Sequence, residues 1–77
     1  MSKIFVIEPY GPYYEKLSGS ATPVVTRLFG GKPRAYIERE DAEERAAKLQ
    51  EGVLGLPMWY RVVERPDAEA FMYGDIG

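Results

Sequence analysis

The 77-residue sequence contains no cysteine and no histidine. Their absence excludes disulfide bonds, thiolate nucleophiles, zinc sites of the usual kind and acid–base catalysis by imidazole. The charge excess is also small, since ten Lys and Arg against twelve Asp and Glu leave a formal net charge of −2. A general nucleic-acid binder needs a basic surplus to displace counterions from phosphate, so this balance argues against one, although a local basic face remains possible.

Long hydrophobic runs are missing from the N-terminal region. Its one apolar run is Ile4–Ile7, which is too short for the core of a signal peptide. It is also far below the roughly 20 apolar residues that span a bilayer. We therefore expect no targeting or membrane segment and a cytoplasmic protein.

The residues that are present are typical of a folded protein, with 45% apolar, 13% aromatic and 29% charged side chains. A chain of this length has room for one small core, so we predict a single domain over residues 1–77. Because such a core is only marginally sufficient, spare aromatic side chains could complete their burial in a homodimer, as in a self-associating accessory subunit.

The N-terminal half is predicted to consist of strands and one long loop. Residues 3–8 are β-branched and aromatic with charged ends, which favours a strand. Residues 9–23 contain three prolines, two glycines and three tyrosines, which is typical of a loop. Residues 24–29 indicate a second strand, and Gly30-Gly31 predicts a hairpin turn into a return strand from residue 33 to 37 or 38.

The C-terminal half is predicted to contain the main helix, over residues 39–51. Its buried stripe follows i, i+4, i+7 spacing and consists of Ala42, Ala46, Leu49 and Val53, widened by Ala47. Gly52 is placed to end the helix in the left-handed conformation. Residues 58–64 alternate as a last strand, and residues 67–73 favour one or two helical turns.

These elements predict a small α+β domain with the order β-loop-β-β-α-β and a short C-terminal appendage. A helix that covers one face of an antiparallel or mixed sheet of about four strands is the economical arrangement. The first and last strands are both apolar enough to be central, so we expect them to be neighbours.

No catalytic or metal-binding pattern stands out. Ser18 and Ser20 lie near Lys16, but in a Gly/Pro loop without the strand-to-helix elbow of a nucleophile. Gly30-Gly31-Lys32 lacks the spacing of a phosphate-binding loop and precedes a strand. The carboxylates around Asp41 do not follow calcium-loop spacing. We therefore predict a non-enzymatic protein without a metal or cofactor.

Two features favour binding to another protein. Tyrosines beside small flexible residues are typical of adaptable protein-binding surfaces, and the candidates are Tyr10, Tyr13 and Tyr14. Five carboxylates crowd residues 38–44, and they also suit the start of a helix through its dipole. Of these, Glu40, Asp41 and Glu44 are candidates for steering against a basic partner surface.

A second interpretation is a small module that binds RNA or single-stranded DNA. Basic residues and one aromatic residue gather around the predicted hairpin, and aromatic and arginine side chains on a sheet can stack and hold single strands. The residues concerned are Arg27, Lys32, Arg34 and Tyr36. The sequence contains no RNP-like motif, so protein binding remains the preferred interpretation.

The predicted hairpin, the helix within AYIEREDAEERAAKL (residues 35–49) and one more strand give the chain a loose resemblance to a known group of proteins. In architecture and composition, residues 24–64 resemble small orphan proteins of bacterial viruses and mobile elements, among them the anti-CRISPR inhibitors. The resemblance implies a phage-encoded inhibitor in the bacterial cytoplasm that occupies the surface of a host nucleoprotein complex. These inhibitors share no signature, so the resemblance assigns no site residue.

Overall fold

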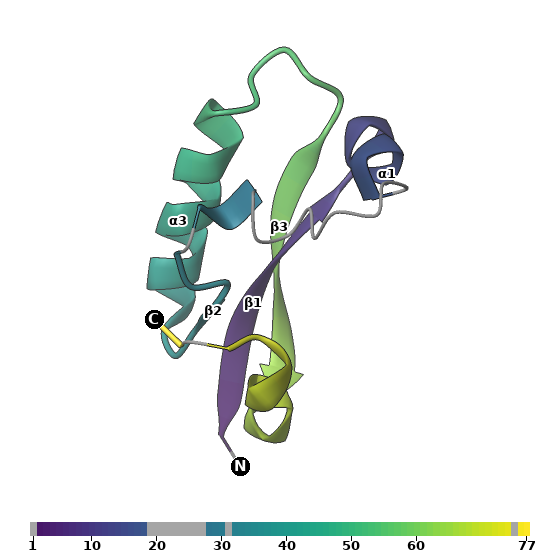
Figure 1. The fold of residues 1–77 in the computed structure, drawn as a ribbon. Helices are drawn as coiled ribbons and strands as arrows, with labels where there is room; N and C mark the ends of the chain where they lie inside the picture. Colours follow the sequence, from purple (N-terminus) through teal and green to yellow (C-terminus); the bar gives the residue numbers. More distant parts are fainter. Residues whose placement is uncertain (1, 19–27, 31, 75) are drawn as a thin grey trace.

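An antiparallel sheet and one main helix organise the chain in the computed structural model (Figure 1), which describes residues 2–18, 28–30, 32–74 and 76–77. The described elements are, in chain order, β1 (Lys3–Tyr10), α1 (Pro12–Ser18), β2 (Ala35–Tyr36), α3 (Arg39–Glu51), β3 (Trp59–Pro66) and the 3-10 helix η1 (Asp67–Met72). The expected α+β class is therefore confirmed in its coarse form.

β1 is the central strand of a sheet with the order β2-β1-β3. It pairs with β3 along its whole length, from Lys3 opposite Pro66 to Tyr10 opposite Trp59. Its pairing with the two-residue β2 is short and places Phe5 opposite Tyr36. The expectation that the first and last predicted strands are neighbours is confirmed.

The predicted hairpin around Gly30 is wrong. Leu28 and Phe29 have helical backbone instead of the predicted strand, and the strand that follows, β2, pairs with β1. Residues 24–27 of that predicted strand lie outside the described part of the chain. Phe29 is buried and packs edge-on against Tyr60, with 6.1 Å between ring centroids. This ring packs under the main helix from the helical turn at Leu28 and Phe29, and the described part of the sheet has three strands instead of about four.

The predicted loop over residues 9–23 is wrong at its beginning, because β1 continues through Pro9 and α1 follows. Ile7 donates its N–H to the carbonyl of Arg34 at 2.9 Å, so alternate residues of β1 direct their backbone groups toward β2. Pro9 points the same way, beyond the end of the two-residue β2, so its missing N–H costs no ladder bond. Pro12 then occupies the first position of α1, where proline is favoured.

The main helix has the predicted bounds. Its residues Ala42 and Ala46 are buried, as expected. Ala47 is exposed and does not widen the buried stripe. Gly52 is not left-handed, since its φ is −72°, and Gly55 in the following connection takes the positive φ of 87° instead. The chain therefore makes further turns over residues 52–55, after the end of α3, before it enters β3.

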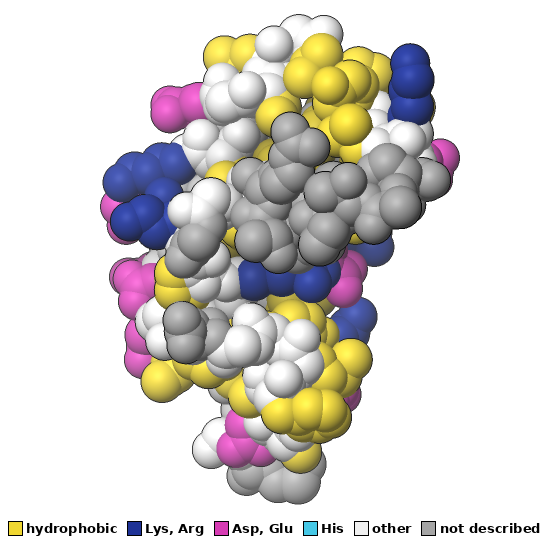
Figure 2. Space-filling view, in the orientation of Figure 1, with side chains coloured by type: hydrophobic (Ala, Val, Ile, Leu, Met, Phe, Trp, Pro, Cys, Tyr) yellow, Lys and Arg dark blue, Asp and Glu magenta, His cyan; other side chains and the backbone are white. Residues whose placement is uncertain are grey.

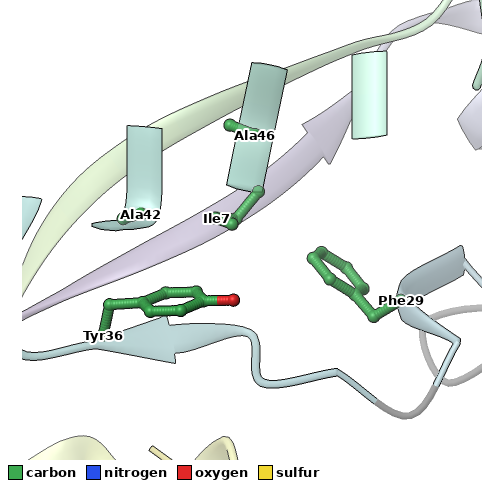
Figure 3. Packing of buried hydrophobic residues seen from close by; sticks show 5 residues of the cluster. All are labelled: Ile7, Phe29, Tyr36, Ala42 and Ala46. Carbon is green, nitrogen blue, oxygen red and sulfur yellow. The ribbon is translucent and has the colours of Figure 1, made fainter. Parts of the chain in front are cut away.

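The two faces of the sheet are covered differently, because side chains alternate along β1. Phe5 and Ile7 face α3, and the cluster there includes Phe29 and Tyr36 (Figure 3). Ile4 and Val6 face the other way, against side chains of the C-terminal segment such as Ala70 and Tyr73. The predicted turns after β3 are confirmed as η1, which helps to cover this second face.

The C-terminal residues return to the sheet beside β2. Ile76 forms an isolated parallel bridge with Ala35, and Gly77 donates its N–H to the carbonyl of Ala35 at 2.8 Å. Within the described residues, no helix combines the length and the apolar character needed to cross a bilayer.

Candidate functional site

Tyr10 is the predicted anchor that the structure places in the most exposed aromatic contact. It is the last residue of β1 and lies opposite Trp59, the first residue of β3. Their ring centroids are 5.9 Å apart, and both rings are partly exposed, at 41% for Tyr10 and 45% for Trp59. The guanidinium of Arg61 lies 5.1 Å from the centroid of the Tyr10 ring. We call these three side chains the Tyr10–Trp59 surface.

The backbone register explains why these three side chains meet. Directly opposed residues of an antiparallel pair share a face, and residues two apart on one strand do the same. Tyr10 is opposite Trp59, and Arg61 is opposite Glu8, two positions before Tyr10. Neither Trp59 nor Arg61 is among the residues that the sequence analysis selects, although alternation places both on one side of the last strand. The alternation of residues 58–64, combined with the expected pairing of first and last strands, was the signal that could have found them.

The backbone around this surface is held from two sides. Gln50 of α3 donates to the carbonyl of Met58 and accepts the N–H of Tyr60, both at 3.1 Å. On the α1 side, Tyr13 donates its N–H to the carbonyl of Pro57 at 3.1 Å. These contacts pre-organise the start of β3, which lowers the entropic cost of using its side chains in binding.

The predicted anchors Tyr13 and Tyr14 lie in α1 and are partly buried, so neither is as open as Tyr10. Other exposed apolar side chains, Leu54 and Leu56, belong to the connection between α3 and β3. Figure 2 shows hydrophobic side chains gathered at the end of the molecule where α1 and this connection lie. Of the three predicted anchors, Tyr10 is therefore the most exposed, and its ring neighbour is Trp59 instead of a second tyrosine.

Half of the positive charge of Arg61 and Arg65 on this sheet face is balanced by one carboxylate of the same chain. One oxygen of Glu8 lies 3.3 Å from Arg61 and its other oxygen lies 3.3 Å from Arg65. A carboxylate between two guanidinium groups offsets much of the field that they would present to a phosphate. This arrangement suits a partner that offers apolar area and hydrogen bonds more than a polyanion.

The opposite sheet face carries a separate ion-pair network. Glu64 accepts a hydrogen bond from Arg39 at 2.8 Å and lies 3.4 Å from the ammonium of Lys3. The hydrogen bond from Arg39, followed by the charge of Lys3, holds the pKa of Glu64 below its ordinary value. Nearby in the same layer, burial raises the pKa of the Tyr60 phenol. Both groups belong to the packing of α3 on the sheet.

The predicted acidic residues do not adjoin the Tyr10–Trp59 surface. All three are exposed on α3: Glu40, Asp41 and Glu44. The guanidinium of Arg39, the first residue of α3, lies 4.9 Å from the centroid of the Phe5 ring. Phe5 precedes Tyr10 by five positions along β1, which corresponds to about 17 Å. A hollow of about 210 Å³ beside Asp41 and Glu44 is also lined by Tyr36, Arg45 and Lys48. The acidic set therefore lies toward the other end of the sheet and beside basic side chains.

The residues of the nucleic-acid interpretation are partly used inside the fold. Arg34 donates from Nε to the carbonyl of Ile7 at 3.1 Å, and its guanidinium lies 5.4 Å from the Tyr73 ring centroid. Tyr36 is only 7% exposed, and its hydroxyl donates to the carbonyl of Pro33 at 3.0 Å. The ring therefore offers no open face for a base, because it completes the core beneath α3.

The two remaining basic residues of that interpretation are Arg27 and Lys32. Lys32 is exposed, and Arg27 lies outside the described residues. Of the three described residues, Arg34 and Tyr36 are engaged within the fold, and only Lys32 is exposed.

Neither metal ligands nor similar proteins identify a site among the described residues. Within the part of the chain that the structure describes, no group of three or more Asp or Glu side chains is arranged to hold a metal ion. Comparisons with family models, with curated proteins and with solved structures gave no match. The candidate site therefore rests on the geometry of the Tyr10–Trp59 surface.

Proposed function

We propose that this chain is a non-enzymatic protein-binding module that engages its partner through the Tyr10–Trp59 surface. The observation that supports this proposal is the meeting of a tryptophan, a tyrosine and an arginine on one rigid sheet face. These are the three residue types enriched at the energetic centres of protein interfaces. Their rings are already paired before binding, so little side-chain entropy is lost when a partner covers them.

The same surface also suits stacking of single-stranded nucleic acid, which is the alternative function. Two aromatic rings beside an arginine on a sheet are a common platform for bases. The charge pattern favours a protein partner, because Glu8 is ion-paired with both Arg61 and Arg65 and offsets one of their two positive charges, and because the chain carries a net charge of −2. Binding to phosphates gains its affinity from uncompensated positive charge, and Glu8 leaves only one such charge between Arg61 and Arg65.

The finer prediction, an inhibitor of a host nucleoprotein complex of the anti-CRISPR type, rests on the architectural resemblance of residues 24–64. Leu28 and Phe29, the described end of the predicted strand in that range, have helical backbone, which weakens the resemblance. The role as a protein-binding module does not depend on it.

The test compares three immobilised baits in nuclease-treated extract from the organism that encodes the chain. The baits are the wild type, Trp59→Ala and the matched control Phe71→Ala, which removes an aromatic ring that is 84% exposed on η1. Removal of a central interface tryptophan costs about 2 kcal/mol, or roughly a thirtyfold loss of affinity. We expect a stoichiometric protein that the wild type and Phe71→Ala retain and that Trp59→Ala loses.

Thermal melting of each bait accompanies the capture, so that a loss caused by unfolding is recognised. Equal capture by all three folded baits would show that the Tyr10–Trp59 surface is not the binding site. Capture by the wild type from untreated extract that is absent after nuclease treatment would transfer the proposal to nucleic acid. In that case, affinity for a single-stranded oligonucleotide should fall steeply with salt.

A further inference from the structure

The outer edge of β3 is a separate feature from the Tyr10–Trp59 surface. β1 occupies the inner edge of β3 over eight paired positions, and β3 is the last strand in the order β2-β1-β3. Among the described residues, no strand pairs with the outer edge. A long strand edge that is open to pairing is a template for another strand, and proteins usually cover or interrupt it.

The register identifies which backbone groups lie on this outer edge. Ile7 directs its N–H toward β2, so Ile7 and Val62, which are opposite each other, do not exchange hydrogen bonds. Val62 and the residues two positions on either side, Tyr60 and Glu64, therefore direct their N–H and C=O groups away from β1. The hydrogen bond from the N–H of Tyr60 to the side chain of Gln50 agrees with this assignment.

Both ends of the outer edge are closed within the molecule. The side-chain amide of Gln50 donates a hydrogen bond to the carbonyl of Met58 and accepts one from the N–H of Tyr60. At the other end, Arg65 donates to the carbonyl of Glu64 at 3.3 Å, and Pro66 has no N–H to offer. The groups left between these ends are the carbonyl of Tyr60, the N–H and carbonyl of Val62, and the N–H of Glu64.

We propose that these groups bind a second copy of this chain, with two β3 strands antiparallel about a two-fold axis at Val62. Only in this register does each of the four free backbone groups meet a free partner group of the second copy. The N–H of each Val62 meets the carbonyl of Val62 in the other copy, and the N–H of each Glu64 meets the carbonyl of Tyr60. Four hydrogen bonds result, and the groups occupied by Gln50 and Arg65 are not required.

The side chains favour the same register. It places Tyr60 opposite Glu64 of the second copy, Arg61 opposite Val63 and Trp59 opposite Arg65. A tyrosine beside a carboxylate and a tryptophan beside a guanidinium are favourable cross-strand pairs.

Two neighbouring registers also place equivalent faces of the two copies on the same side of the combined sheet. Both of these registers bring like charges together. A two-fold axis at Arg61 would oppose Arg61 to itself, and an axis at Val63 would oppose Arg61 to Arg65 twice. Like charges directly opposite one another destabilise strand pairing. Charge and hydrogen bonding therefore select the axis at Val62 independently of each other.

The consequence is a six-stranded antiparallel sheet with two copies of the Tyr10–Trp59 surface on one face. Arg65 of the second copy joins Trp59 at each surface, so the dimer adds a residue that one chain alone does not supply there. Closed two-fold pairing also removes the open strand edge from solvent, because each copy covers the edge of the other.

The test uses the purified full chain and measures association and amide exchange together. Sedimentation over roughly two orders of magnitude in protein concentration should show a monomer–dimer equilibrium. In the dimer, the amides of Val62 and Glu64 should exchange at least about tenfold more slowly than in the monomer. The amide of Val63 points toward β1 and is the internal control, because its protection does not require the second copy.

A cross-linking variant tests the register. Val62→Cys introduces the only thiol, since the chain has no cysteine, and the axis at Val62 brings the two copies' Cα atoms to about 5.5 Å, within disulfide reach. The control Met72→Cys places a thiol on an exposed residue of η1. Mild oxidation should yield disulfide-linked Val62→Cys dimers and leave Met72→Cys mostly unlinked.

A chain that stays monomeric throughout, or a dimer in which the Val62 and Glu64 amides still exchange rapidly, would overturn the proposal. Equal cross-linking of both cysteine variants would also overturn it. Protection of the Val62 amide only in the presence of an unrelated protein would assign the edge to that partner instead of a second copy. None of these results depends on the partner of the Tyr10–Trp59 surface, so failures of the two proposals are distinguishable.

Discussion

Substitution of Gly11 by alanine should be among the most damaging single changes in this chain. Gly11 joins β1 to α1 with a φ of 117°, a conformation that residues with a Cβ rarely adopt. A Cβ at this position would lie 2.7 Å from the carbonyl oxygen of Pro57 and 2.9 Å from Cα of Met58. Both neighbours are backbone atoms, so rotation of a side chain cannot relieve the overlap.

The expected cost follows from these two contributions. Holding alanine at this backbone conformation costs about 1–3 kcal/mol. Displacing the Pro57–Met58 backbone adds to that cost, for a total of about 3 kcal/mol, which lowers Tm by roughly 10–20 °C in a domain of this size. The matched control is Gly30→Ala, since Gly30 has a φ of 56° and no atom of the described residues lies within 4 Å of the place its Cβ would take. That change should cost about 1 kcal/mol, from the left-handed conformation alone.

Fluorescence of Trp59 is the natural assay, because it is the one tryptophan in the chain and its ring lies 3.0 Å from the position of the added Cβ. Thermal and urea unfolding of the two variants and the wild type can then be followed at the site itself. A Gly11→Ala variant that melts within about 2 °C of Gly30→Ala would refute the reasoning, since it would mean that the start of α1 does not press on the start of β3.

Two further predictions concern the core and the α3–sheet ion pairs. Ile7 is fully buried in the cluster under α3, so Ile7→Ala should lower the free energy of unfolding, measured by urea denaturation, by about 2–5 kcal/mol. The control Ile37→Ala changes a side chain that is 63% exposed and should have little effect. The pKa of Glu64 is lowered from 4.5 chiefly by its hydrogen bond from Arg39, so its contribution to stability is complete above that value and is lost as the pH falls through the folded-state pKa. The Tm values of the wild type and Glu64→Gln should therefore differ at neutral pH and converge in acid. An equal difference in Tm at both pH values would contradict the assignment. Glu40→Gln is the control for the loss of one carboxylate.

The sequence predicts well the elements whose signal is local and repeated. α3 has the expected bounds because acidic residues at its start and alanines at helical spacing act within one segment. The strands at both ends of the chain, and their adjacency, follow from apolar content that must be buried somewhere in so small a core. Composition alone also removed catalysis by cysteine or histidine from consideration.

Tertiary packing decided the features for which local signals competed. The glycine pair at residues 30–31 favours a hairpin, but β2 pairs with β1 and the Phe29 ring enters the core under α3, where its burial outweighs a turn preference. The candidate site has the same origin. Tyr10 and Trp59 are far apart along the chain, and only the antiparallel register of β1 and β3 brings their rings together, because strand pairing sets which distant residues are opposite. The sequence determined what each segment could form, and the shared core determined which segments met.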